Sequence, residues 1–103
     1  MNIYGIGSDI ININRIKKSL KNKKFLKRIF NLTEIKKCNI NYNKSNCFAK
    51  RFAAKEAFVK ALGTGISKGI NFNEIVVFNI KSGRPTIRLI GSTSIIVNKL
   101  MKQ

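Results

Sequence analysis

One segment of this chain constrains its fold more than any other, because it is long, rich in alanine and free of helix breakers. It spans Ser45–Leu62, contains neither Gly nor Pro, and is followed at once by Gly63. Its alanines are Ala49, Ala53, Ala54, Ala57 and Ala61. Alanine has the highest helix propensity, and glycine is a common residue just past a helix C-terminus. The segment therefore predicts a long central helix.

Shorter elements are expected on both sides of this helix. Before the long helix, apolar periodicity and turn residues predict a strand over Ile3–Ile6, then helices over Ile10–Leu20, Phe25–Phe30 and Thr33–Ile40, the last capped by Thr33, and then a loop over Asn39–Asn46. After it, they predict a hairpin of two strands over Ile75–Ile80 and Thr86–Ile90. A closing helix is expected over Ile95–Leu100. We find no internal repeat and no linker. The expected architecture is a single α+β domain spanning residues 1–103, with a small antiparallel sheet packed with the long helix and the shorter helices.

The chain is strongly basic. It has 21 Lys and Arg against 4 Asp and Glu, a formal charge of +17 on 103 residues. Such a field favours nucleic acid, acidic proteins, phosphorylated ligands or anionic membranes as partners. Lys, Asn and Ile are also abundant, as in a product of A- and T-rich coding, so the charge is weak evidence of function.

Cysteine spacing and hydropathy bear on the compartment. Cys38 and Cys47 form no CxxC pair, and the chain has no histidine, so we expect two reduced thiols and no zinc site. No apolar run approaches about 18 residues, and the start lacks a basic segment followed by a long apolar one. We therefore expect a cytoplasmic protein without membrane insertion.

The four carboxylates are Asp9, Glu34, Glu56 and Glu74. Glu56 precedes Lys60 by one helical turn, which fits either a solvent-exposed Glu–Lys pair or a metal ligand beside a cation that binds phosphate. Asp9 fits either a helix N-cap or a second metal ligand. Mg²⁺ is commonly held by one or two carboxylates together with substrate phosphates, so Asp9 and Glu56 are a candidate pair.

Basic residues and glycines near these carboxylates are candidates for phosphate contacts. Lys55 and Lys60 would neutralise phosphate oxygens or the charge that grows on a leaving phosphate. The turn Gly63-Thr64-Gly65 would let backbone N–H groups approach a phosphate, but it serves equally as a helix C-cap. Together these residues indicate phosphoryl-type transfer.

Two motifs make the sequence resemble a known family. They are Gly5-Ile6-Gly7-Ser8-Asp9 and the run Arg51-Phe52-Ala53-Ala54-Lys55-Glu56-Ala57-Phe58-Val59-Lys60-Ala61-Leu62-Gly63-Thr64-Gly65. They match the G-x-D and [FW]xxKExxxK signatures of holo-acyl-carrier-protein synthases, the small 4′-phosphopantetheinyl transferases. The resemblance continues through residues 69–75 and 82–85, and it implies the fold of that family.

The resemblance implies Mg²⁺-dependent transfer of the phosphopantetheine arm from coenzyme A to a serine of apo acyl carrier protein, with release of adenosine 3′,5′-bisphosphate. It implies a role in fatty-acid biosynthesis and a homotrimer with active sites at subunit interfaces. By position, Asp9 and Glu56 resemble the metal ligands, and Lys60 resembles the partner of the leaving phosphate. Glu56 or a water on the metal would accept the serine proton.

The resemblance also implies binding roles for further residues, by their positions in the family motifs. Arg51, Lys55 and the turn Gly63-Thr64-Gly65 would help to bind the coenzyme A phosphates, and Arg15 would meet the acidic carrier protein. Family members usually continue past the last helix with an H-x-S-x-[ST]-H strand, a motif that this histidine-free chain lacks. Asn12 and Ser8 also depart from the residues usual in the family, but neither is a proposed ligand.

Three functional hypotheses result. The first is an active transferase that still assembles as a trimer, and we favour it. The second is a truncated, inactive relative that binds carrier protein. The third is a basic nucleic-acid-binding module, suggested by the charge and the interspersed aromatic residues. The third lacks a recognisable RNA- or DNA-binding motif, so no nucleic-acid partner is expected.

Overall fold

The structure is a computed structural model, and it describes residues 15–63 and 69–101. Residues 15–19 are helical. The elements that follow are α2 (Lys23–Ile29), α3 (Leu32–Asn39), α4 (Lys44–Leu62), the 3-10 helix η1 (Phe72–Glu74), β1 (Ile75–Asn79), β2 (Pro85–Leu89) and α5 (Gly91–Met101). The predicted strand over Ile3–Ile6 lies outside the described residues. The α+β class is confirmed.

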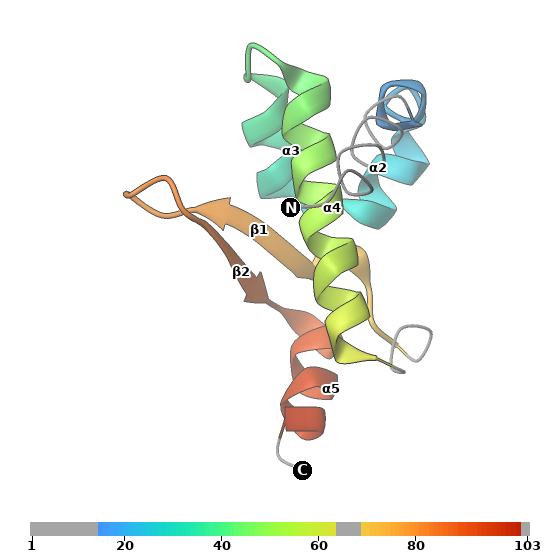
Figure 1. Ribbon diagram of the computed structural model, residues 1–103. Coiled ribbons are helices and arrows are strands. Elements are labelled where there is room, and N and C mark those ends of the chain that lie inside the picture. The colour runs from blue at the N-terminus through green and yellow to red at the C-terminus, as the bar shows by residue number, and fades with distance from the viewer. Residues whose placement is uncertain (1–14, 64–68, 102–103) are drawn as a thin grey trace, which may run out of the picture.

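Helix α4 is the long central helix that the alanine-rich segment predicts. It begins one residue earlier than expected, because the side chain of Asn43 accepts a hydrogen bond from the backbone N–H of Asn46 at 3.2 Å. It ends at Gly63, whose φ of 85° is readily adopted by glycine alone. Figure 1 shows α4 running through the middle of the molecule, with α3 packed along its N-terminal half.

Helices α2 and α3 both begin at asparagine caps. The Asn22 side chain accepts from two N–H groups of the first turn of α2. Asn31 caps α3 by accepting from the N–H of Thr33 at 3.0 Å, and Glu34 completes a capping box by accepting from the N–H of Asn31. The prediction of Thr33 as the cap was therefore wrong: Thr33 lies inside α3, and its hydroxyl donates to Asn31.

The two described strands form the predicted hairpin. β1 and β2 are antiparallel with Val77 opposite Ile87, and the turn between them closes with hydrogen bonds from the Ile80 N–H to the Arg84 carbonyl and from the Gly83 N–H to the Ile80 carbonyl. Strand β1 is buried at alternate positions and packs against α3 and α4. The hairpin therefore joins the helices through one face of β1.

The apolar core consists of two clusters along α4. The first surrounds the N-terminal half of the helix, where the rings of Phe30 and Phe48 meet edge to face with centroids 4.8 Å apart. The second surrounds the C-terminal half and contains Val59, Ile70, Ile75 and Val97. Each cluster holds a different group of elements against the same helix.

A disulfide joins α3 to α4. Cys38 and Cys47 are bonded, with their Cα atoms 5.4 Å apart and both residues buried. The expectation of two reduced thiols was therefore wrong. The physical reason is the short connection of residues 40–43, which folds α3 back along α4 and brings the two positions within the Cα distance that a disulfide needs.

Candidate active site on helix α4

Glu56 and Lys60 lie one turn apart on α4, as predicted. Glu56 is partly exposed and Lys60 is exposed. Among the hydrogen bonds and ion pairs between described residues, none involves the Glu56 carboxylate; the ion pair that is found joins Lys55 to Glu34. The Glu56–Lys60 pair that spacing also suggested is thus not formed. Neither the Glu56 carboxylate nor the Lys60 ammonium is bonded to a described side chain.

Part of the predicted site falls outside the described residues. Asp9, Thr64 and Gly65 belong to that part, so their roles stay predictions. Among described residues, no group of three His, Cys, Asp or Glu side chains is close enough to hold a metal ion. Gly63 ends α4, and its N–H donates to the carbonyl of Lys60 at 3.1 Å. Gly63 is therefore the C-cap of α4, which is one of the two roles predicted for it.

Lys55 occupies a position quite unlike the one expected for a phosphate contact. Its side chain is 0% exposed, and its ammonium donates to Glu34 Oε1 at 2.6 Å, to the Phe72 carbonyl at 2.8 Å and to the Ile29 carbonyl at 2.9 Å. An ammonium has three protons, and all three are used. The structure therefore contradicts the assignment of Lys55 to coenzyme A phosphate, because this group has neither exposure nor a proton to offer.

Glu34, which the sequence analysis did not single out, is the ion-pair partner that balances the buried charge of Lys55. Its Oε1 accepts from Lys55 and from the N–H of Asn31, and its Oε2 accepts from the N–H of Val77 at 3.0 Å. Burial lowers the pKa of the Lys55 ammonium from its ordinary value, and the hydrogen bond and charge of Glu34 counteract that effect. The two charges form a fully hydrogen-bonded pair inside the protein.

Arg51 lies on α4 one turn before Lys55 and is 8% exposed. One terminal nitrogen donates to the Cys47 carbonyl at 3.4 Å and to Cys47 Sγ at 3.1 Å, while Nε is buried without a partner among described residues. Burial lowers its pKa, with Glu34 opposing the shift. Arg51 also lines a cavity of about 390 Å³ with Lys37 and Lys50. Its contact with coenzyme A stays a prediction.

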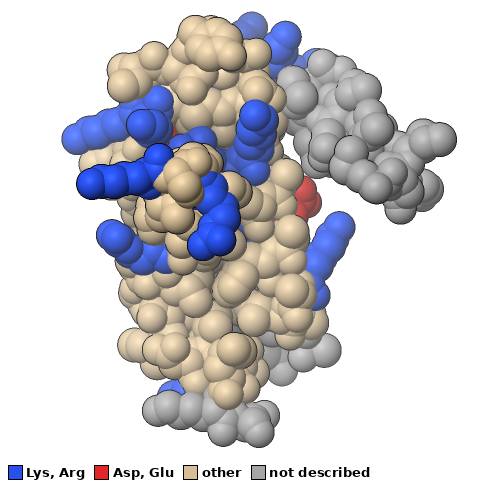
Figure 2. All heavy atoms as spheres, turned by 60° about the vertical axis from the view of Figure 1, so that its left-hand side comes forward, with Lys and Arg blue, Asp and Glu red and all other residues tan. Residues whose placement is uncertain are grey.

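Arg15 is exposed on the helical residues 15–19, whereas the next residue, Ile16, is buried in the first apolar cluster. This confirms an amphipathic segment at that place, and it leaves the Arg15 guanidinium at the surface. Figure 2 shows Lys and Arg side chains spread over the upper half of one face of the molecule, with little Asp or Glu between them. The excess of basic over acidic residues in the sequence therefore gives this face of the molecule a positive surface.

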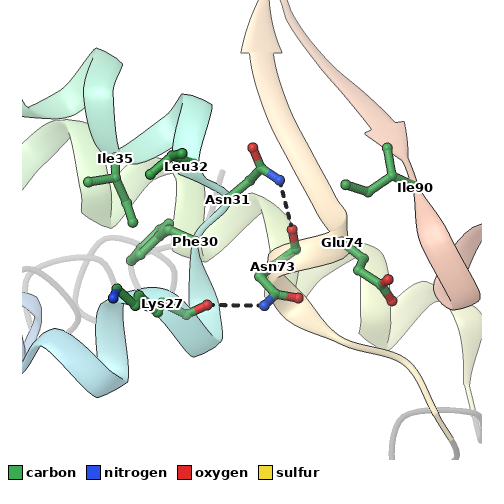
Figure 3. A pocket seen from close by; sticks show the side chains of 8 residues that line it. All are labelled: Lys27, Phe30, Asn31, Leu32, Ile35, Asn73, Glu74 and Ile90. Atoms are coloured by element: carbon green, nitrogen blue, oxygen red, sulfur yellow. Dashed lines mark hydrogen bonds between the residues drawn. The ribbon is translucent and has the colours of Figure 1, made fainter.

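A second cavity, of about 380 Å³, lies between the α2–α3 junction and the start of β1 (Figure 3). Two asparagines tie its sides together: Asn73 Nδ2 donates to the Lys27 carbonyl at 3.0 Å, and Asn31 Nδ2 donates to the Asn73 carbonyl at 3.5 Å. Its remaining lining includes Phe30, Leu32, Ile35 and Ile90. These bonds hold η1 against the end of α2.

Glu74 binds the first turn of α5. Its carboxylate accepts from the N–H groups of Ser92 and Thr93 and from both of their hydroxyls. The hydrogen bond from the Asn71 side chain, followed by that from the Thr93 hydroxyl, lowers the pKa of Glu74 to about 2. Gly91 has a φ of 60°, and a Cβ there would collide with this carboxylate. Glu74 is thus a capping group for α5.

Sequence comparison assigns the chain to a family. The sequence model of the 4′-phosphopantetheinyl transferase superfamily matches residues 5–99. A holo-[acyl-carrier-protein] synthase of Pelagibacter ubique is 47% identical over 102 residues, which cover 99% of this chain and 80% of that protein. A protein of the same name from Buchnera aphidicola subsp. Schizaphis graminum is 49% identical over 92 residues, covering 87% and 73%.

Structural comparison agrees. The structure of apo-ACPS from Chronobacterium ammoiniagenes superposes with a TM-score of 0.68 at 25% identity and covers 88% of this chain and 72% of that one. The acyl carrier protein synthase of Plasmodium yoelii, with ADP bound, superposes with a TM-score of 0.62 at 33% identity and covers 85% and 69%. The chain belongs to the 4′-phosphopantetheinyl transferase superfamily. It is an enzyme, a transferase of that family.

Proposed function

We propose that this chain is a holo-acyl-carrier-protein synthase, which transfers 4′-phosphopantetheine from coenzyme A to a serine of apo acyl carrier protein. The observation that carries the proposal is the pair Glu56 and Lys60, one turn apart on α4, with a Glu56 carboxylate that has no partner among described residues. In a family whose relatives bear this name, an acid and a cation so arranged suit a reaction at a pyrophosphate.

The residues present fit a magnesium ion. Mg²⁺ prefers hard oxygen ligands and is commonly held by one or two carboxylates together with substrate phosphates. Glu56 offers one such carboxylate, unengaged by described residues, and Asp9 is the second proposed ligand. When bound, the ion would neutralise charge on the pyrophosphate and make its phosphorus easier to attack.

Lys60 acts on the leaving group in this proposal. The serine hydroxyl of the carrier gives its proton to Glu56 or to a water, its oxygen forms a bond to the phosphorus that bears pantetheine, and the bond from that phosphorus to the oxygen of adenosine 3′,5′-bisphosphate breaks. Negative charge grows on the departing phosphate. The exposed ammonium of Lys60 is suited to stabilise it, because a cation placed where charge develops lowers the barrier.

The basic surface is suited to both substrates. Acyl carrier proteins are acidic and coenzyme A carries several phosphates, so a positive field would accelerate the encounter with each. Arg15 is exposed at the place where the family resemblance puts the carrier. We extend the proposal to a cytoplasmic homotrimer that serves fatty-acid biosynthesis. Within the described residues, no helix is long and apolar enough to cross a membrane.

The proposal is tested by the intact mass of apo carrier protein after incubation with this chain, coenzyme A and Mg²⁺. We expect a gain of one phosphopantetheine, which is absent with a chelator and absent from a carrier whose acceptor serine is replaced by alanine. A folded chain that produces no gain but binds nucleic acid with steep salt dependence would replace the proposal with the nucleic-acid-binding hypothesis. Light scattering tests the trimer.

A further inference from the structure

Lys55 lies between the two apolar clusters that hold helix α4. Phe48 belongs to the first cluster and Val59 to the second, and Lys55 is placed along the helix between them. Apolar attraction is not directional, so it determines how closely a helix packs more strictly than how it is rotated about its axis. A polar group at this boundary can supply the direction that apolar contacts lack.

The ammonium of Lys55 supplies three directional bonds to three different elements. It donates to the carbonyl of Ile29 at the end of α2, to the carbonyl of Phe72 at the start of η1 and to the carboxylate of Glu34 in α3. Glu34 in turn accepts from the N–H of Val77 in β1. All these bonds would have to break or bend for α4 to rotate, and buried polar groups left without partners are costly.

Two further hydrogen bonds hold the α2–α3 junction and η1 together on the side that faces solvent. In Figure 3, the side chain of Asn73 points to the Lys27 carbonyl, and that of Asn31 points to the Asn73 carbonyl. These two bonds tie η1 to the α2–α3 junction, whose backbone also binds Lys55 from inside. The acceptors of Lys55 are therefore themselves fixed.

Glu56 is the next residue after Lys55, and its carboxylate has no hydrogen bond or ion pair with another described residue. The rotation of α4 therefore sets the direction in which the Cα–Cβ bond of Glu56 leaves the helix, and with it the region that the carboxylate can reach. A carboxylate about 6 Å from the helix axis moves by about 1 Å when the helix turns by about 10°. Misplacement by about 1 Å can cost a reaction about 10²-fold.

We propose that Lys55, held by Glu34, is the positioning residue for Glu56: the buried ion pair fixes the rotation of α4 and thereby aims the Glu56 carboxylate at the metal. This inference rests on the proposed function, in which Glu56 is a metal ligand. It also gives a reason for a lysine next to the acid inside the protein, where an apolar residue would fill the space without directional bonds.

The test compares the double variant Lys55→Met/Glu34→Gln with Lys44→Met, a matched control that removes an exposed lysine from the same helix. All measurements are made at a temperature well below the melting midpoint of each variant. The first quantity is the Kd of Mn²⁺ in the presence of coenzyme A, obtained from the paramagnetic resonance of the unbound ion. The second is the Mg²⁺ concentration that gives half the maximal rate of transfer. We expect the double variant to raise both by about 10-fold or more. The control should change neither.

A folded double variant with wild-type Mn²⁺ affinity would overturn the inference and leave the pair a purely structural one. Asn73→Ala provides a second variant, because it removes the hydrogen bond that ties η1 to the Lys27 carbonyl; we expect Mn²⁺ affinity to fall about 2- to 3-fold, as when a residue that supports a metal ligand is removed. If the double variant does not fold, unchanged affinity in Asn73→Ala overturns the inference. Failure of the proposed function would show differently: the wild type itself would neither bind Mn²⁺ nor transfer, and both proposals would fall.

Discussion

The ammonium of Lys55 lies 2.6 Å from Oε1 of Glu34, and the two side chains are 0% and 1% exposed. Adjacent residues of the Lys-Glu dipeptide on α4 thus point to different surroundings. Lys55 is bound inside the protein by three elements, whereas Glu56 is partly exposed and has no described partner. The acid that we propose as a ligand is thus adjacent in sequence to a buried side chain that three hydrogen bonds hold.

Removing one member of the Lys55–Glu34 pair should lower the free energy of unfolding more than replacing both members by uncharged residues. Lys55→Met leaves the Glu34 carboxylate buried without its counter-charge, and we expect a loss of about 3–5 kcal/mol in the free energy of unfolding. The double variant Lys55→Met/Glu34→Gln removes both charges, so its loss should be smaller than that of the single variant. Urea unfolding of the wild type, both single variants and the double variant measures the coupling. Additive losses would show that the pair does not act as a unit.

Lys60→Ala should slow the chemical step and leave docking intact. The Lys60 ammonium is exposed and bonded to no described side chain, so its removal should spare the fold. We expect kcat to fall about 10²-fold, as for the loss of one group that stabilises transition-state charge. The Kd for apo carrier protein should stay within about 3-fold of the wild type, measured by calorimetry. Lys44→Ala, which removes an exposed lysine of the same helix, is the control; weaker carrier binding with unchanged kcat would make Lys60 a docking residue instead.

Glu74 should make stability depend on pH in the acid range. Its folded-state pKa of about 2 lies below the ordinary 4.5, so its contribution is fully present above about pH 4.5 and is lost as the pH falls toward 2. The difference in unfolding free energy between the wild type and Glu74→Gln should shrink across that window. Urea unfolding at several pH values measures it, and Asn71→Ala, which removes the largest cause of the shift, should move the window upward. A difference that does not vary with pH would refute the assignment.

Reduction of the Cys38–Cys47 disulfide should destabilise the chain. The bridge closes a loop of nine residue steps, and in the chain-entropy account such a loop contributes about 2–3 kcal/mol. Dithiothreitol should therefore lower the melting temperature of the wild type and leave that of Cys38→Ser/Cys47→Ser unchanged. A thiol titration of denatured, unreduced protein provides the decisive count. Two titratable thiols would mean that the bridge is absent from the purified protein.

The central helix, the hairpin and the order of the elements from α2 to α5, apart from η1, could be predicted because they depend on local features. The predicted start of α4 differs from the observed one by a single residue, since alanine content and a following glycine act over neighbouring positions. The hairpin strands end within one residue of their expected positions because the turn residues Ser82, Gly83 and Arg84 separate two apolar runs. Such features need no knowledge of the rest of the fold.

The position of Lys55 could not be predicted in the same way. Helical spacing shows which residues share a face, but it assigns a lysine to solvent by default, and burial of Lys55 depends on Glu34, which is 21 residues away in sequence. Glu34 carried one detectable signal, since Asn31 and Glu34 have the spacing of a capping box. The disulfide was missed for a related reason: the antiparallel packing of α3 on α4 brings Cys38 to Cys47, and spacing alone does not reveal it.

The measurement that tests this account most directly is the intact mass of apo carrier protein treated side by side with the wild type and with Glu56→Gln, in coenzyme A and a series of Mg²⁺ concentrations. Glutamine keeps the size of the side chain and removes the charge that binds a cation, so the variant should melt within a few degrees of the wild type. We predict a Mg²⁺-dependent gain of one phosphopantetheine with the wild type and a rate at least about 10²-fold lower with the variant. Equal rates from the two proteins would contradict the assignment of Glu56, and no gain from a folded wild type would contradict the proposed function itself.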